Sequence, residues 1–213
     1  MLSSALLLVL AYLLGSVSGS LLLGGLRGVD VRRQGSGNAG GTNAFRALGW
    51  RFALGVVAID VGKGALAAGL ALALAPAEGA VAPLVLAYGA IVLAVAGHTW
   101  PLFYGFRGGK GAATLVGGLA VVWPGALPVL LLVWLACIVL TGYVGLATML
   151  AAGVLVPLAW FGGADPMRLA FALAALVFIV FNHRDNVRRL VHGCENRFER
   201  ARVLHRLLRR RQA

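Results

Sequence analysis

The chain has 213 residues, is 60% hydrophobic and 12% charged, and carries 19 Lys and Arg against 7 Asp and Glu. This composition excludes an ordinary soluble domain. Several apolar runs are long enough to cross a bilayer as helices, and they follow one another through short connections. Because a membrane-spanning segment must satisfy its own backbone hydrogen bonds, we predict an all-α polytopic membrane protein in which residues 1–213 form one integral membrane domain.

Seventeen of the 19 basic residues fall in three stretches, 27–51, 107–110 and 184–211. Under the positive-inside rule these stretches face the cytoplasm, so we expect the N-terminus outside and the C-terminus in the cytoplasm. The net charge of +12 then matches an anionic membrane surface, and nucleic acid is not an expected partner.

The first predicted span is Leu2–Leu26. Its arginines follow the apolar run instead of preceding it, which is not the pattern of a cleaved signal peptide. Gly15 and Gly19 form a GxxxG pair, which predicts close packing against another helix.

A polar loop, VRRQGSGNAGGTNAFRALG, is expected over 31–49. Three of its glycines have the GxGxxG spacing, but a dinucleotide site needs a preceding strand, and the flanks here are membrane helices. The loop also carries hydrogen-bond donors that suit a phosphate or a polyol, namely Ser36, Asn38, Thr42, Asn43 and Arg46. The alternative is a polar turn with ordinary helix caps.

The second predicted span, Phe52–Ala75, contains Asp60 and Lys63, which share a helix face at i, i+3. Ionisable residues at this depth are rare and point into a bundle or a cavity. Two interpretations stay open: a group that serves a substrate, or a buried pair that only fixes helix packing.

A third span, Val81–Gly97, leads to the stretch GHTWPLFYGFRGGKGAATLVGG. Gly108, Gly109 and Gly111 let the backbone turn so that several N–H groups can face one anion, and Lys110 adds a positive charge where the next helix begins. We predict a phosphate-binding loop here. The alternative is a glycine turn whose lysine reaches the lipid headgroups.

Residues 112–161 form a long apolar region with interruptions at Trp123–Pro124 and at 141–143. The chain crosses the membrane an odd number of times here, because it passes from the inside at Lys110 to the outside at Asp165. Three crossings give seven spans in total, which is the count we expect, and one crossing gives five spans with a re-entrant segment.

The last span, Met167–Asn182, ends in a polar cluster at 182–186, on the same side as both glycine loops. His183 is a candidate general base or phosphate ligand, although a histidine at a membrane boundary can equally be a solvated cap. The tail 184–213, rich in Arg and Leu at helical spacing, is expected to be an amphipathic helix on anionic lipid. Cys and His show no metal-ligand spacing, so we expect no metal.

Four blocks of sequence then carry a family resemblance: GSGNAGGTN with Arg46, DVGKG, GHTWPLFYGFRGGKGAAT, and HRDNVRRLVHGCEN. In order and spacing they resemble the bacterial acyl-phosphate:glycerol-3-phosphate acyltransferases, the PlsY family, over nearly the whole chain. The resemblance implies a seven-helix bundle in the bacterial inner membrane with a cytoplasmic active site. It also implies acyl transfer from acyl phosphate to the 1-hydroxyl of glycerol 3-phosphate, without acyl-CoA, acyl carrier protein or a cofactor.

The motifs and the resemblance give two sets of expected site residues. The catalytic set is Ser36, Arg46, Lys110, His183 and Asn186. The set expected to bind substrate phosphates is Gly37, Asn38, Thr42, Asn43, Lys63, His98, Gly108, Gly109, Gly111, Thr114 and Glu195. The expected partners are acyl phosphate, glycerol 3-phosphate and the phospholipid bilayer. The competing hypothesis is a membrane carrier for an organic phosphate, which needs polar groups open alternately to both faces.

Overall fold

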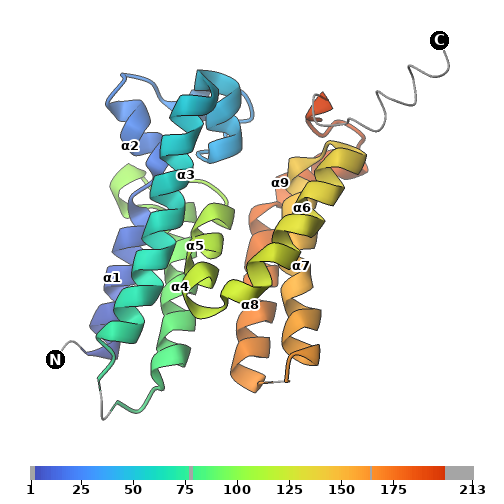
Figure 1. Ribbon diagram of the computed structural model, residues 1–213. Helices are drawn as coiled ribbons and strands as arrows, with labels where there is room; N and C mark the ends of the chain where they lie inside the picture. The colour runs from blue at the N-terminus through green and yellow to red at the C-terminus, as the bar shows by residue number, and fades with distance from the viewer. Residues whose placement is uncertain (1–2, 77–78, 164, 200–213) are drawn as a thin grey trace. The chain divides into compact units, whose positions relative to one another are not determined.

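The computed structural model describes residues 3–76, 79–163 and 165–199, which contain helices and loops and no strand (Figure 1). The all-α prediction is therefore confirmed for these residues. The chain divides into two compact units, unit 1 (Met1–Pro124) and unit 2 (Gly125–Ala213). The helices are α1 (Ser4–Ser16), α2 (Gly19–Gly25), η1 (Val31–Arg33), α3 (Gly41–Ala73), α4 (Pro83–Thr99), η2 (Leu102–Tyr104), α5 (Ala112–Val122), η3 (Pro124–Ala126), α6 (Leu127–Thr141), α7 (Val144–Phe161), α8 (Pro166–Asn182) and α9 (Arg184–Val191).

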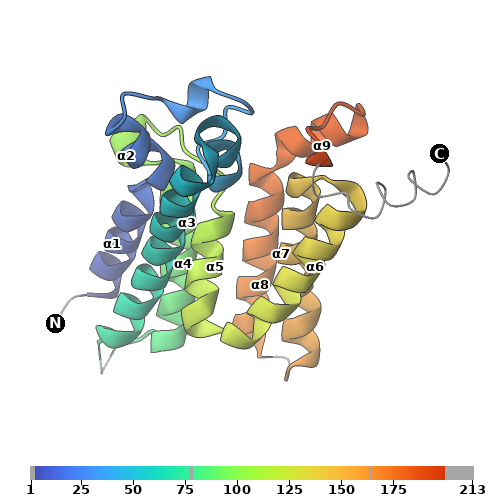
Figure 2. The same ribbon diagram turned by 45° about the horizontal axis from the view of Figure 1, so that its top comes forward.

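Unit 1 is a bundle in which α1 packs on α3 and α4, and α5 packs on α3 and α4. The short helix α2 packs on α3. Both glycine-containing loops, 26–40 and 100–111, lie at the same end of this unit, and α3 ends and α4 begins at the other end (Figure 1 and Figure 2). The bundle therefore carries the polar loops together on one of its ends.

The sequence predicted a single span over Leu2–Leu26, but the structure divides this segment into two helices. α1 ends at Ser16, α2 begins at Gly19, and the two helices are bent by 50° relative to each other. Val17 and Ser18 between them have extended backbone. The last carbonyls of α1 consequently lose their partners in the helix and need donors from elsewhere. Those donors come from α3.

The third helix begins at Gly41 and not at the predicted Phe52, so part of the predicted polar loop is helical. Gly40 occupies the N-cap position of α3. A break at Gly49, with φ 83° and ψ 178°, separates the polar first turns from the apolar part of the helix. This backbone region is essentially restricted to glycine, so Gly49 allows the two parts to follow one another at an angle.

Glycines allow the helices of unit 1 to pack with their backbones in contact. A Cβ on Gly15 or Gly97 would overlap the backbone of the facing helix where α1 crosses α4, and one on Gly19 would press on the backbone of α3. Likewise, where α3 crosses α5, a Cβ on Gly64 would overlap the backbone of α5 and a Cβ on Gly117 would overlap the backbone of α3. The close packing predicted from the GxxxG pair is therefore confirmed.

Gly117→Ala is expected to lower the free energy of unfolding by about 1–3 kcal/mol, because the added methyl group pushes α5 away from α3. SDS-induced unfolding in mixed micelles measures the change. Gly69→Ala is the matched control, since nothing lies within 4 Å of a Cβ at Gly69. There we expect a stabilisation of about 0.5–1 kcal/mol from helix propensity alone. Equal effects at the two glycines would contradict the packing argument.

Unit 2 consists of α6, α7, α8 and α9, with α7 packed on both α6 and α8. Both predicted interruptions are confirmed, because α5 ends before Trp123 and α6 ends at Thr141, where its C-cap Gly142 is left-handed with φ 79°. α9 follows α8 with a bend of 59°. The predicted amphipathic tail is helical only over α9, because residues 192–199 form turns and irregular chain, which corrects that part of the prediction; residues 200–213 lie outside the described residues.

In the part of the chain that the structure describes, four helices are individually long and apolar enough to cross a membrane, and the number is six if each bent pair, α1 with α2 and α8 with α9, forms one span. The apolar helix α5 has only 11 residues, which rise about 16 Å, roughly half the thickness of the hydrocarbon core. The predicted count of seven spans requires α5 as the seventh, and these helices do not confirm it.

Candidate active site

One buried amide holds the loop between α2 and α3 in shape. Asn43, in the first turn of α3, is 1% exposed. Its Nδ2 donates to the carbonyls of Val31 (3.0 Å) and Gln34 (2.9 Å). Its Oδ1 accepts the N–H of Ser36 at 2.9 Å. Asn43 therefore closes the loop onto α3, and both N–H groups of its amide are used within the protein.

Exposed donors predicted to bind phosphate belong to this closed loop and to the helix that follows it. Ser36 and Gly37 are exposed in the loop, and Asn38 is half-buried. Thr42 and Arg46 are exposed on α3 and are four residues apart, so they share one helix face. The contacts of Asn43 bring the backbone of Ser36 to the same turn of α3.

The second loop folds back onto the end of α4. The N–H of Gly108 donates to the carbonyl of Thr99, and that of Gly109 to the carbonyl of His98, both at 3.0 Å. These two amides are engaged, which corrects that part of the predicted phosphate cradle. Glycine is required at 109 for a different reason, because a Cβ there would overlap the carbonyl of Ala39 and the His98 ring.

What remains of the predicted anion site is the N-terminus of α5. Gly111 caps this helix with φ 81°, and Lys110 directly precedes the cap. The N–H of Leu115 donates to the carbonyl of Gly111, so the N–H groups before Leu115 have no acceptor inside the helix. Thr114 in the same turn is fully buried, and its Oγ1 has no hydrogen-bond partner among the described residues. The helix dipole and the lysine both favour an anion here.

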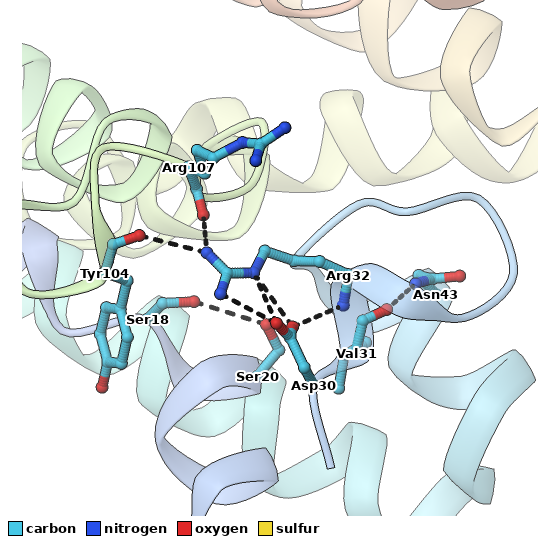
Figure 3. A network of polar contacts seen from close by, with 8 residues as sticks. All are labelled: Ser18, Ser20, Asp30, Val31, Arg32, Asn43, Tyr104 and Arg107. Atoms are coloured by element: carbon cyan, nitrogen blue, oxygen red, sulfur yellow. Dashed lines mark hydrogen bonds and ion pairs between the residues drawn. The ribbon is translucent and has the colours of Figure 1, made fainter.

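Arg32 joins the two loops, as Figure 3 shows. Its Nη1 donates to the carbonyls of Tyr104 (3.1 Å) and Arg107 (3.0 Å) in the second loop. Its Nε and Nη2 bind the carboxylate of Asp30 at distances of 2.9 to 3.2 Å. The hydrogen bonds from Arg32 lower the pKa of Asp30 below its ordinary value of 3.8, so this carboxylate is charged at neutral pH. The two loops form one connected structure.

A buried cluster of ionisable side chains lies at the break between α1 and α2. Lys63 Nζ is 3.0 Å from Asp60 Oδ1 and 2.7 Å from His98 Nδ1. Lys63 also donates to the carbonyls of Gly15 and Val17, at 2.9 Å each, and the first N–H of α2 donates to Asp60 at 3.0 Å. The cluster thus supplies hydrogen bonds that the helix break removes. This supports the packing interpretation of the pair over a substrate-binding one.

His183 connects α8 to α9 in unit 2 and is 4% exposed. Its Nδ1 lies 2.8 Å from the carbonyl oxygen of Ile179. A carbonyl can only accept, so Nδ1 carries the proton and Nε2 is the basic nitrogen of the neutral ring. A general base that acts through Nε2 requires this tautomer.

Asn186 and Glu195 are bound to each other in unit 2. Asn186 Nδ2 donates to Glu195 Oε1, and Arg189 Nε donates to Glu195 Oε2, both at 2.7 Å. A Cβ on Gly145 of α7 would lie only 2.7 Å from Asn186 Nδ2, so glycine leaves the room that the amide occupies. With both oxygens engaged and its side chain 5% exposed, Glu195 orients Asn186 and is poorly suited to hold a phosphate.

The expected site residues fall into two groups, one in each unit. Unit 1 brings the two glycine loops together, and unit 2 brings Asn186 and Glu195 together just after His183. Sequence reasoning did not single out Asp30, Arg32 or Arg189. Arg189 is one of ten arginines after His183, and nothing in the sequence distinguishes it from the other nine. For Asp30 and Arg32, the sequence did offer a signal, namely an acidic residue two positions before an arginine within a basic stretch.

Comparisons with known proteins agree on one family. The family described as "Glycerol-3-phosphate acyltransferase" matches residues 5–193. Curated proteins of the same name are 38% identical over 190 residues in Clostridioides difficile and 41% identical over 191 residues in Desulforudis audaxviator, and each match covers 89% of this chain and 92% of the relative. A crystal structure of PlsY (YgiH), described as an integral membrane glycerol 3-phosphate acyltransferase in its glycerol 3-phosphate form, is 34% identical with a TM-score of 0.84. That match covers 92% of this chain and 95% of the other, and the lysophosphatidic acid form gives a TM-score of 0.82.

Proposed function

The chain belongs to the glycerol-3-phosphate acyltransferase family, and from that premise we propose that it acylates glycerol 3-phosphate with an acyl phosphate as the donor. The acceptor is supported by the family and by the two ligand forms of the related PlsY structure. The donor is supported by the chain's own chemistry, since it offers basic groups and glycine loops of the kind that bind phosphate.

In the proposed reaction the 1-hydroxyl oxygen of glycerol 3-phosphate attacks the acyl carbon. The bond between that carbon and the phosphate oxygen breaks, which releases 1-acyl-glycerol 3-phosphate and inorganic phosphate. An acyl phosphate is a mixed anhydride with a good leaving group, so direct transfer needs no acyl-enzyme. The hydroxyl proton passes to His183 Nε2 or to a phosphate oxygen of the substrate. Positioning and charge neutralisation supply most of the rate acceleration.

The anion-binding residues of the proposal lie in unit 1. Lys110 and the N-terminus of α5 hold one phosphate, with the buried hydroxyl of Thr114 in the first turn of this helix as a further donor. Ser36 and Arg46 hold the other phosphate, with support from their exposure on the first loop and on α3. Gly37, Asn38, Thr42 and Gly111 complete the binding surfaces.

Other predicted residues are assigned supporting roles, because their polar groups already contact protein. These residues are Asn43, Lys63, His98, Gly108, Gly109 and Glu195. His183 and Asn186 are assigned to the glycerol 3-phosphate hydroxyl, with support from the tautomer of His183. The observation that carries the proposal is the pair of glycine loops joined at one end of unit 1, with Lys110 at the N-terminus of α5.

The proposed location is the bacterial cytoplasmic membrane, with the active site on the cytoplasmic face. Its support is the clustering of 17 of the 19 basic residues in three stretches, two of which overlap the glycine loops. A seventh span formed by α5 belongs to the same proposal.

Purified protein in detergent is expected to convert palmitoyl phosphate and glycerol 3-phosphate into lysophosphatidate and inorganic phosphate in equal amounts. Lysophosphatidate is measured by mass spectrometry and phosphate by a colorimetric assay. Palmitoyl-CoA and palmitoyl acyl carrier protein are the matched donors, and we expect no product from either. Product from palmitoyl-CoA alone would reject the proposed donor, and no product from any of the three would reject the proposed activity.

A further inference from the structure

Arg32 has the charge of a phosphate ligand but a guanidinium that is already engaged. Its Nε and Nη2 bind Asp30, and its Nη1 binds two backbone carbonyls of the other loop. Four of the five N–H groups of the side chain therefore have protein acceptors. A substrate phosphate would have to displace these bonds, so the geometry favours a crosslink between loops over a ligand.

The two carbonyls flank a strained turn in the loop that leads to Lys110. They belong to Tyr104 and Arg107, and the residues between them, Gly105 and Phe106, have φ values of 65° and 58°. A non-glycine residue with positive φ is costly and persists only where its surroundings hold it. Arg32 supplies one bond on each side of this turn, three residues before Lys110.

The same arginine is fixed on the first loop. The carboxylate of Asp30 accepts the backbone N–H of Arg32 at 3.0 Å as well as the side chain. The neighbouring carbonyl of Val31 accepts from Asn43, which in turn holds Ser36. Figure 3 shows this continuous path from the second loop through Arg32 to Asn43.

We infer that Arg32 is a positioning residue that sets the spacing between the two phosphate-binding loops, and that Asp30 orients its guanidinium. The inference rests on the proposed function, because that function assigns a substrate phosphate to each loop. Neither Arg32 nor Asp30 contacts a substrate in this assignment. A shift of about 1 Å between two bound reactants costs about 100-fold in rate. If loss of the crosslink changes the spacing of the two loops, turnover should therefore fall.

Arg32→Gln is expected to lower kcat/KM for palmitoyl phosphate and glycerol 3-phosphate by about 100-fold. The thermal midpoint should move by no more than about 3 °C, because the Arg32–Asp30 ion pair is only half-buried, with side chains 30% and 31% exposed, and solvent screens it. Arg33→Gln is the matched control, since it removes the same charge from the next residue, which is exposed. We expect less than about a twofold change there. Equal activities of the two variants would overturn the inference.

Arg32→Lys separates geometry from charge. A lysine keeps the charge but cannot bind a carboxylate and two carbonyls at once, so it should lose at least about tenfold in kcat/KM. Recovery of wild-type kcat/KM in Arg32→Lys would instead identify Arg32 as a simple point charge and overturn the inference. Asp30→Asn should lower kcat/KM in the wild-type background and have no further effect in Arg32→Gln, because Asp30 acts through the arginine.

Hydrogen–deuterium exchange tests the crosslink without any assay of turnover. Arg32→Gln should raise exchange in peptides covering 31–40 and also in those covering 102–111, whereas Arg33→Gln should change neither. A rise confined to the first loop would overturn the inference. If the wild-type protein proved inactive with the proposed substrates, the proposed function would fail, while the exchange pattern would still decide whether Arg32 joins the loops.

Discussion

Replacing Lys110 with alanine is expected to lower kcat/KM for acyl transfer by about 10²- to 10³-fold. Lys110 directly precedes the cap of α5, where the helix dipole and the N–H groups before Leu115 already favour an anion. In the proposed site, removing the ammonium takes away the full charge that would balance the phosphate in the transition state. The measurement is initial-rate kinetics with palmitoyl phosphate and glycerol 3-phosphate on detergent-purified protein.

Arg107→Ala is the matched control for Lys110→Ala. Arg107 lies in the same loop with an exposed side chain, and its contact with Arg32 uses only the backbone carbonyl, which alanine retains. We expect less than about a threefold change in kcat/KM for this variant. A Lys110→Ala protein with wild-type turnover, or one no more impaired than Arg107→Ala, would remove Lys110 from the proposed active site.

The elements that the sequence predicted well are those set by local chemistry. Trp123–Pro124 and Gly142 interrupt apolar runs, and helices end there, because proline and left-handed glycine act on their own neighbours. Asp60 and Lys63 share a helix face because their spacing is a property of one helix, and they form the ion pair that this spacing allows.

The break in the first helix was missed because its cause lies in another segment. The break at Val17 and Ser18 involves no proline. Its extended backbone is stabilised by hydrogen bonds with Lys63 and Asp60 of α3. A contact between residues 46 positions apart leaves no trace in the local pattern of the first span. The start of α3 at Gly41 was missed for a related reason, since a polar helix turn looks like a polar loop until Asn43 closes it.

The glycine motifs predicted the two loops that Arg32 joins, but not which of their amides are engaged within the protein. Sequence reasoning counted the amides of Gly108 and Gly109 as an anion cradle, whereas both donate to the last turn of α4. Their glycine character is required by close contact with Pro101, His98 and Ala39. Glycine spacing alone does not separate these two needs, because both call for a missing side chain.

Lys63→Met is expected to lower the free energy of unfolding by about 3–5 kcal/mol, because it removes the ammonium from the buried Asp60 carboxylate, which keeps only His98, 3.4 Å away, as an ionisable neighbour. SDS-induced unfolding in mixed micelles measures the loss. Leu66→Ala on the same helix is the control, since this leucine is 50% exposed and should change stability by less than about 0.5 kcal/mol.

The double variant Asp60→Leu with Lys63→Met decides what the buried pair is for. If the two charges only neutralise each other, an apolar replacement of both should recover most of the stability. We expect it not to, because the carbonyls of Gly15 and Val17 and the first N–H of α2 lose their partners, at about 1–3 kcal/mol for each buried group. A double variant as stable as wild type would show that the helix break is held by packing alone. A double variant that stays at least about 2 kcal/mol less stable would show that the pair exists to satisfy the backbone of a helix broken inside an apolar bundle.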